Sequence, residues 1–176
     1  MKGFTLVELL VVLAIIGVLA TVVTLVINPL ELMKRSRDSN RLKDLENLSQ
    51  ATNISLQEGS LSSSSIASVL CKTSGSYPCV GSSNTGNRLT DGNGWVKTDL
   101  ASQNSITVPT LPVDPVNDSN YHYTYCADND LYELNTTLES DQFRAKMFSD
   151  GGDSIDQYEV GSNLNLIANS GGSCEY

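Results

Sequence analysis

Glu8 is the residue of this sequence whose surroundings most need a chemical explanation. It is the ionisable side chain within an apolar run that extends from Phe4 to Ile27. A carboxylate in such a segment is unfavourable in lipid, and intramembrane acids mark functional sites by default. A free α-amine on Phe4 would be a natural partner for it. That amine exists only if the chain is cut after Gly3, so the arrangement predicts processing at this bond.

Four cysteines are the next candidates for chemistry. An even number in a Ser/Thr/Asn-rich domain favours disulfides over a metal site. Of the three possible pairings we prefer Cys71–Cys79, which closes a tight loop, with Cys126–Cys174, which ties the C-terminal tail to a predicted strand. The longer loop should stabilise the fold more, on the order of 4 kcal/mol in the chain-entropy model. Free thiols are the alternative.

Two acidic turns could supply oxygen ligands to a cation. Ca²⁺ takes about six to eight oxygens from carboxylates, amides and carbonyls. Neither turn has the spacing of an EF-hand loop, and solvated turn acids are the competing interpretation. The candidate ligands are Asp114, Asn117 and Asp118 in one turn, and Asp150, Asp153 and Asp156 in the other.

The sequence offers little support for an enzyme. It contains no G-x-S-x-G elbow, no Walker loop and no H-E-x-x-H motif, and His122 is its one histidine. No two carboxylates can be paired for acid–base work from one sequence. The formal charge of −9 also disfavours nucleic-acid binding, which depends on clustered Lys and Arg. We therefore expect neither an enzyme nor a nucleic-acid-binding protein.

The elements that position Glu8 begin with a long helix. Residues 4–27 would span about 36 Å at ~1.5 Å per residue, enough to cross a bilayer core of ~30 Å. Gly17 should loosen this helix, and Pro29 should interrupt it because proline lacks the amide hydrogen. An amphipathic pattern then resumes and predicts a stem helix over 28–59, with Gly59 as its stop.

A basic cluster follows the apolar run. By the positive-inside rule it would face the cytoplasm, whereas the cysteines favour an exported domain. The cluster could contact anionic headgroups, pair with acidic patches on neighbouring subunits, or form a solvated helix face. Its members are Lys34, Arg35, Arg37, Arg41 and Lys43.

Residues 60–176 are predicted to form a small head. The Ser-rich segment at 62–65 and the residues up to 93 are expected to be mainly loop, and Trp95 is expected to be a core residue. Alternating tyrosines at 121, 123 and 125 predict a strand, 128–130 a turn, 131–137 a returning strand and 157–160 a third strand. The expected fold is α+β, with the sheet packed on the amphipathic stem.

The N-terminus resembles the class III signal of type IV pilins and of the pseudopilins of type II secretion. The matching residues are Gly3, Phe4, Thr5, Leu6, Glu8 and Leu9. The segment Leu111-Pro112-x-Asp114-Pro115, with the tyrosines after it, resembles major pseudopilins, which bind calcium in the loops of their C-terminal sheet. No other cofactor is expected. The resemblance implies a pilin-like lollipop with residues 1–3 as a leader.

This resemblance also implies how the protein is processed and assembled. Prepilin peptidase would cleave between Gly3 and Phe4, and Phe4 would be N-methylated. Glu8 would then neutralise the terminal amine of a neighbouring subunit in a homopolymer built from the N-terminal helices. The implied location is the bacterial inner membrane, with the head outside the cytoplasm and an assembly platform as partner, and afterwards an extracytoplasmic or cell-surface filament.

Several alternatives stay open. The apolar run could be a secretory signal peptide cut after Ala20, or a simple anchor with Glu8 at the interface. The protein could be an anchored surface-binding protein that never polymerises, a tip adhesin or a minor pilin, including one used in DNA uptake. The sequence does not separate a pilus subunit from a secretion pseudopilin.

Overall fold

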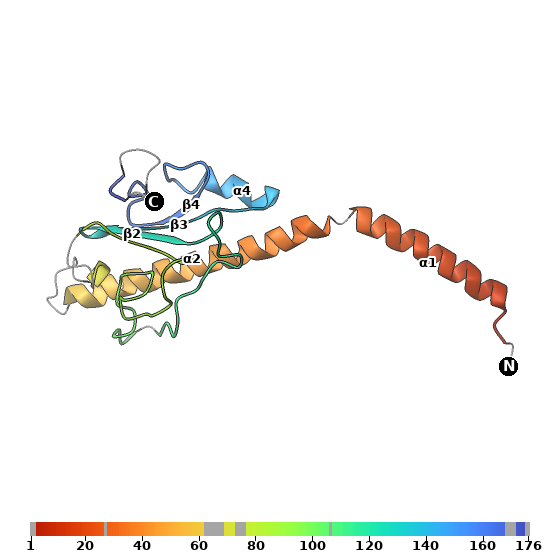
Figure 1. Ribbon diagram of the computed structural model, residues 1–176, viewed down its shortest axis with the longest axis horizontal. Helices are drawn as coiled ribbons and strands as arrows, with labels where there is room; N and C mark the ends of the chain where they lie inside the picture. Colours follow the sequence, from red (N-terminus) through yellow and green to blue (C-terminus); the bar gives the residue numbers. More distant parts are fainter. Residues whose placement is uncertain are drawn as a thin grey trace.

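The computed structural model describes residues 3–26, 28–61, 69–72, 77–105, 107–167 and 172–174. Helix α1 (Leu6–Val26) is followed by helix α2 (Pro29–Leu61) and by a small antiparallel sheet. Figure 1 shows α1 extending away from the head, with the sheet lying along the second half of α2. This arrangement confirms the expected α+β, pilin-like architecture. The leader before Gly3 and the serine run at 62–65 lie outside the described residues.

The boundary between α1 and α2 is a well-formed helix start. Asn28 Oδ1 accepts a hydrogen bond from the Glu31 N–H at 3.4 Å, and the Asn28 carbonyl accepts one from Leu32 N at 3.2 Å. Asn28 is thus the N-cap of α2, and Pro29 occupies the first helical position, where its missing N–H is not needed. Pro29 thus separates α1 from α2 by occupying the first position of α2.

Gly59 does not end α2, so the predicted stop is wrong by two residues. A Cβ at this position would lie 2.4 Å from Val69 Cγ2. A glycine therefore lets the chain return close to the helix, and α2 continues to Leu61.

The sheet has four antiparallel strands in chain order: β1 (Cys79–Ser82), β2 (Thr124–Asp128), β3 (Leu131–Thr136) and β4 (Tyr158–Gly161). A two-residue loop joins β2 to β3, and Asn129 in it has φ 57°, a left-handed value that asparagine tolerates. The predicted hairpin and third strand are confirmed. Tyr121 and Tyr123, however, lie outside β2, because the strand begins only at Thr124.

Two elements were not predicted from the sequence. Strand β1 falls in the segment expected to be loop, and it is defined by its pairing with β2, for example Val80 opposite Cys126. Helix α4 (Asp141–Met147) did leave a local signal: Ser140 Oγ accepts the Phe143 N–H at 3.3 Å as an N-cap. Four residues carry too little periodicity to reveal β1.

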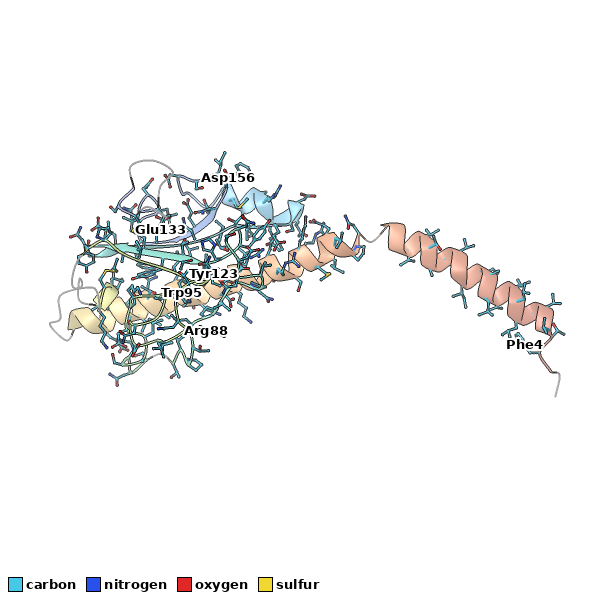
Figure 2. The ribbon with its side chains drawn as sticks, viewed as in Figure 1. Phe4, Arg88, Trp95, Tyr123, Glu133 and Asp156 are labelled. Atoms are coloured by element: carbon cyan, nitrogen blue, oxygen red, sulfur yellow. A yellow bond between two sulfur atoms is a disulfide. The ribbon has the colours of Figure 1, made fainter. Side chains whose placement is uncertain are left out.

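The main core lies between α2 and one face of the sheet. Leu45 and Leu48 of α2 pack there with Tyr123 and Trp95, which is fully buried as predicted. The Trp95 indole N–H donates to the Pro112 carbonyl at 2.9 Å, so its polar atom is satisfied. Figure 2 places Trp95 and Tyr123 where α2 meets the sheet.

Two disulfides hold the head together. The structure pairs Cys71 with Cys79 and Cys126 with Cys174, the connectivity preferred above. The second bridge lies on the sheet face away from α2, in a smaller core with Leu166 and Ile167. It ties the end of the chain to β2.

Two carboxyl groups are buried beside this smaller core. Glu133 and Glu159 lie on neighbouring strands and are 0% and 1% exposed. Glu133 Oε2 accepts the N–H groups of Leu166 and Ile167 at 2.7 and 2.9 Å, whereas its Oε1 has no hydrogen-bond partner among the described residues. Burial raises the pKa of Glu133. Burial and the charges of Glu133, Asp153 and Asp150 raise the pKa of Glu159 to about 8. A single proton shared by the two carboxyl groups would reduce the repulsion between their buried charges.

Replacing Glu159 with glutamine should therefore stabilise the protein most at high pH. A raised folded pKa means that the stability due to Glu159 is fully present below its unfolded pKa and is lost as the pH rises through about 8. We expect the E159Q variant to gain at least about 1 kcal/mol over wild type at pH 9, or ~2–4 °C in Tm, and less at pH 5. Melting curves at both pH values test this. D156N, which changes an exposed acid, is the control, and an E159Q gain independent of pH would contradict the interpretation.

Candidate assembly site

The N-terminus of α1 forms a capping box around Glu8. Thr5 is the N-cap, and its N–H and Oγ1 both donate to Glu8 Oε2, at 2.9 and 2.8 Å. In return the Glu8 N–H donates to Thr5 Oγ1 at 3.2 Å. This is the reciprocal pattern of the T-x-x-E motif. Our sequence analysis did not identify it, although the spacing of Thr5 and Glu8 was visible.

The capping box leaves part of the Glu8 carboxylate free. Both bonds from Thr5 go to Oε2, and Oε1 accepts no hydrogen bond among the described residues. The acid also lies in the first turn of the helix, where the helix dipole favours negative charge. Glu8 is therefore held by its Oε2, and its side chain is exposed with Oε1 left as an acceptor among the described residues.

The apolar surface of α1 has no cover within the chain. None of the helix between Leu6 and Val23 is buried, and this segment is long and apolar enough to cross a membrane. Phe4 is 77% exposed and lies at the end farthest from the head (Figure 2). The single apolar helix near the N-terminus thus fits the membrane anchor of a pilin.

Gly17 lies inside the regular helix. A Cβ at this position would meet nothing within 4 Å, so no contact inside the chain requires glycine there. Its predicted role in loosening α1 stays a prediction.

Arg41 fastens the stem to the head. Its Nε and Nη2 donate to the two carboxylate oxygens of Asp114, at 2.5 and 2.9 Å, and Nη1 donates to Asp38 at 2.8 Å. The side chains of all three residues are fully buried. The guanidinium also lies 5.0 Å from the centre of the Tyr121 ring. Such a bidentate, buried arrangement gives one fixed geometry.

A third acid completes this cluster. Glu139 lies 2.6 Å from Arg41 Nη1 and accepts two hydrogen bonds from Arg37, at 2.8 and 2.5 Å. Asp38 accepts the backbone N–H groups of Glu139 and Ser140. The cluster therefore joins α2 to the Asp114 turn and to the start of α4.

The charges in the cluster reinforce one another. Burial by itself would lower the pKa of Arg41, but the hydrogen bonds and charge of Asp114, with Asp38 and Glu139, outweigh it and raise the pKa. The hydrogen bond from Arg37, followed by that from Arg41, lowers the pKa of Glu139. Arg41 and Glu139 therefore stay ionised at neutral pH.

This geometry corrects the interpretation of the basic cluster as a single exposed surface. Arg41 and Arg37 pair with acids of their own chain, and Arg35 pairs with Glu31 at 3.4 Å. The amphipathic pattern did not reveal these ion pairs, because charged side chains are not expected on the buried face of a helix. Lys34 and Lys43 are the members whose interpretation stays open.

The calcium candidates are dispersed. The Asp114 carboxylate is taken up by Arg41, Asn117 bonds with Ser83, and Asp118 accepts the N–H groups of Asn120 and Tyr121. In the second turn Asp150 accepts the N–H groups of Gly152 and Glu159, while Asp153 and Asp156 are exposed. Within the described residues, no group of three or more His, Cys, Asp or Glu side chains could hold a metal ion. Calcium binding stays a prediction.

Replacing Arg41 with alanine should destabilise the protein severely. The change leaves Asp38 and Asp114 buried without a cation, and breaking a buried ion pair costs about 3–5 kcal/mol. Urea unfolding of the full-length protein in detergent measures the loss. K43A, which removes an exposed cation from the same helix, should stay within about 0.5 kcal/mol of wild type. Equal effects of R41A and K43A would show that the buried cluster contributes nothing.

Comparison with known proteins agrees with the geometry at the N-terminus. The family model described as "Prokaryotic N-terminal methylation motif" matches residues 1–24. Searches of curated proteins and of solved structures found no match. The motif implies processing by prepilin peptidase and is consistent with a type IV pilin or pseudopilin. The chain therefore carries the class III prepilin signal on a pilin-like α+β fold.

Proposed function

We propose that this protein is a structural subunit of a type IV pilus or a type II secretion pseudopilus, and that it has no catalytic role. In this proposal the chain is cut after Gly3, and α1 passes from the membrane into the core of a filament. One observation carries it: α1 is exposed from Leu6 to Val23, and Glu8 near its start has a carboxylate oxygen with no bond to any described residue.

The mechanism is a charge pair between subunits. Cleavage exposes the α-amine of Phe4, and this amine meets Glu8 Oε1 of a neighbouring copy. In an apolar core such a pair is far stronger than in water, whereas either charge alone would be costly. Thr5 is a positioning residue, because its two bonds to Oε2 hold the carboxylate while Oε1 has no bond to any described residue.

A membrane-anchored protein that never polymerises is the second candidate. Lipid, like other copies of the chain, could cover the apolar surface of α1. A simple anchor does not account for an acid inside the apolar run, because a carboxylate there is unfavourable in lipid and an anchor does not require one. The disulfide-bonded head supports a location outside the cytoplasm in either case.

Replacing Glu8 with alanine should leave membrane insertion intact and abolish filaments. The variant keeps the apolar helix and loses the acceptor for the neighbouring amine. Membrane fractionation and electron microscopy of filaments sheared from producing cells measure the two effects. Normal filaments from E8A would defeat the assignment as a polymerising subunit.

Replacing Thr5 with valine should reduce filament yield severalfold without affecting insertion. Valine is close in shape to threonine, but it keeps only the backbone N–H bond to Glu8 and loses both hydrogen bonds that the hydroxyl group makes. T5S, which retains the hydroxyl group, is the matched control and should assemble nearly as well as wild type. If T5V assembles as well as T5S, the orientation of Glu8 by Thr5 is not needed for assembly.

A further inference from the structure

We propose that neighbouring heads contact each other through Phe148 of one copy, which inserts into a groove beside α2 of the next. Arg144 and Lys146, which precede Phe148 on α4, would face Asp44 at the end of this groove. The inference rests on the proposed function and adds to it a head-to-head contact between two copies of this chain.

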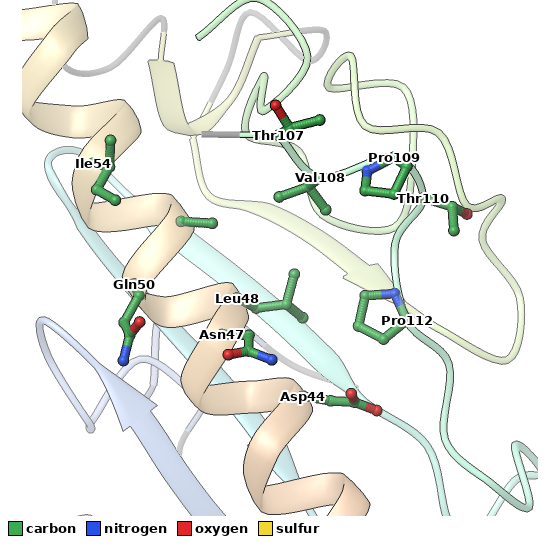
Figure 3. A pocket seen from close by; sticks show the side chains of 11 residues that line it. Asp44, Asn47, Leu48, Gln50, Ile54, Thr107, Val108, Pro109, Thr110 and Pro112 are labelled. Atoms are coloured by element: carbon green, nitrogen blue, oxygen red, sulfur yellow. The ribbon is translucent and has the colours of Figure 1, made fainter. Parts of the chain in front are cut away.

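The groove lies between α2 and the segment 107–112, and its volume is about 430 Å³. Figure 3 shows the helix forming one wall and the proline-containing segment the other. Most of its side chains are apolar, which suits an aromatic ring. These apolar residues are Leu48, Ala51, Ile54, Val108, Pro109 and Pro112.

Asp44 is the ionisable residue of the groove lining. It lies at one end of the groove (Figure 3) and accepts a hydrogen bond from the Tyr123 hydroxyl at 2.9 Å. Burial raises the pKa of Asp44, because its carboxylate has less contact with water than an exposed one has. A cation brought to this end would relieve that cost. The groove thus suits an apolar side chain with a positive charge beside it.

Phe148 provides such a group on the same chain. It is 67% exposed at the end of α4, which is a large apolar surface to leave in water. Arg144 and Lys146 are also exposed, and their side chains form no ion pair or hydrogen bond with any described residue. The other described bases of the head, Lys72, Arg88 and Lys97, are each bonded within the chain.

These features therefore leave an exposed aromatic ring beside free positive charges on a protein of net charge −9. The groove offers the complementary apolar walls and negative charge. Charge and apolar complementarity together make a second copy of this chain the occupant that fits.

The two surfaces lie on opposite sides of the head. Figure 1 places α4, whose start contacts α2, above that helix, and the loops that carry segment 107–112 below it. One copy therefore cannot use both surfaces to bind the same partner copy. A contact between two different surfaces continues from copy to copy and, where its rotation does not close into a ring, generates an open helical array. This is the geometry that a filament of parallel α1 helices needs.

Cysteine cross-linking of intact filaments tests the contact. We would place cysteines at Phe148 and at Asn47, an exposed groove residue, in the same full-length chain, and treat sheared filaments with a short bis-maleimide. The expected result is a ladder of dimers, trimers and higher multimers from F148C/N47C. F148C or N47C alone should give no ladder. F148C/V80C, with its second cysteine on the exposed part of β1 outside the groove, is the matched control.

The outcomes separate the two proposals. Filaments that form without an F148C/N47C ladder, or with an equal ladder in the F148C/V80C control, overturn the head contact and leave the proposed function intact. Absence of any self-association overturns both.

Because cysteines could disturb the native disulfides, F148S gives an independent measurement. It should lower filament yield severalfold at unchanged Tm, whereas L89S, which removes another exposed apolar residue, should not. Equal yields from F148S and wild type also overturn the contact.

Discussion

The rest of the structure depends on an apolar helix that its own chain cannot cover. Between Leu6 and Val23 no side chain is buried, and the head lies wholly on α2. Burying apolar surface releases about 25 cal/mol for each Å², so this helix must be surrounded by lipid or by other copies. The fold keeps α1 clear of the head, which allows the helix to exchange one apolar environment for the other.

A helix that transmits position to the head must be firmly attached to it. Besides the apolar core, α2 is attached by charged groups: Arg41 and Arg37 on α2 join Asp114 and Glu139, which lies at the start of α4. Replacing such a cluster with apolar residues could yield equal stability, since buried ion pairs compensate their own desolvation poorly. The charged arrangement adds a defined orientation, because the bidentate pair of Arg41 and Asp114 holds α2 and the Asp114 turn in one relative position.

Apolar and polar contacts have different roles in the proposed filament. The large surface of α1 would provide most of the association free energy, but an apolar helix can slide along another with little change in energy. A charge pair at Glu8 would set the axial register, because an unpaired charge in the core is costly. The contact between Phe148 and the groove would set the rotation of neighbouring heads. Both are small contacts that select one arrangement among many.

The sequence by itself determined the elements whose causes are local. The apolar run, the Asn28-Pro29 boundary and the 128–130 turn each depend on residues a few positions apart, and the capping box at Thr5 could have been read in the same way. The charge cluster could not, because Arg41 and Asp114 are 73 positions apart and only packing brings them together. The same holds for β1, which exists through its pairing with β2, and for the groove, which needs two distant segments. Tertiary structure decides wherever the stabilising partner lies far along the chain, since no local pattern records it.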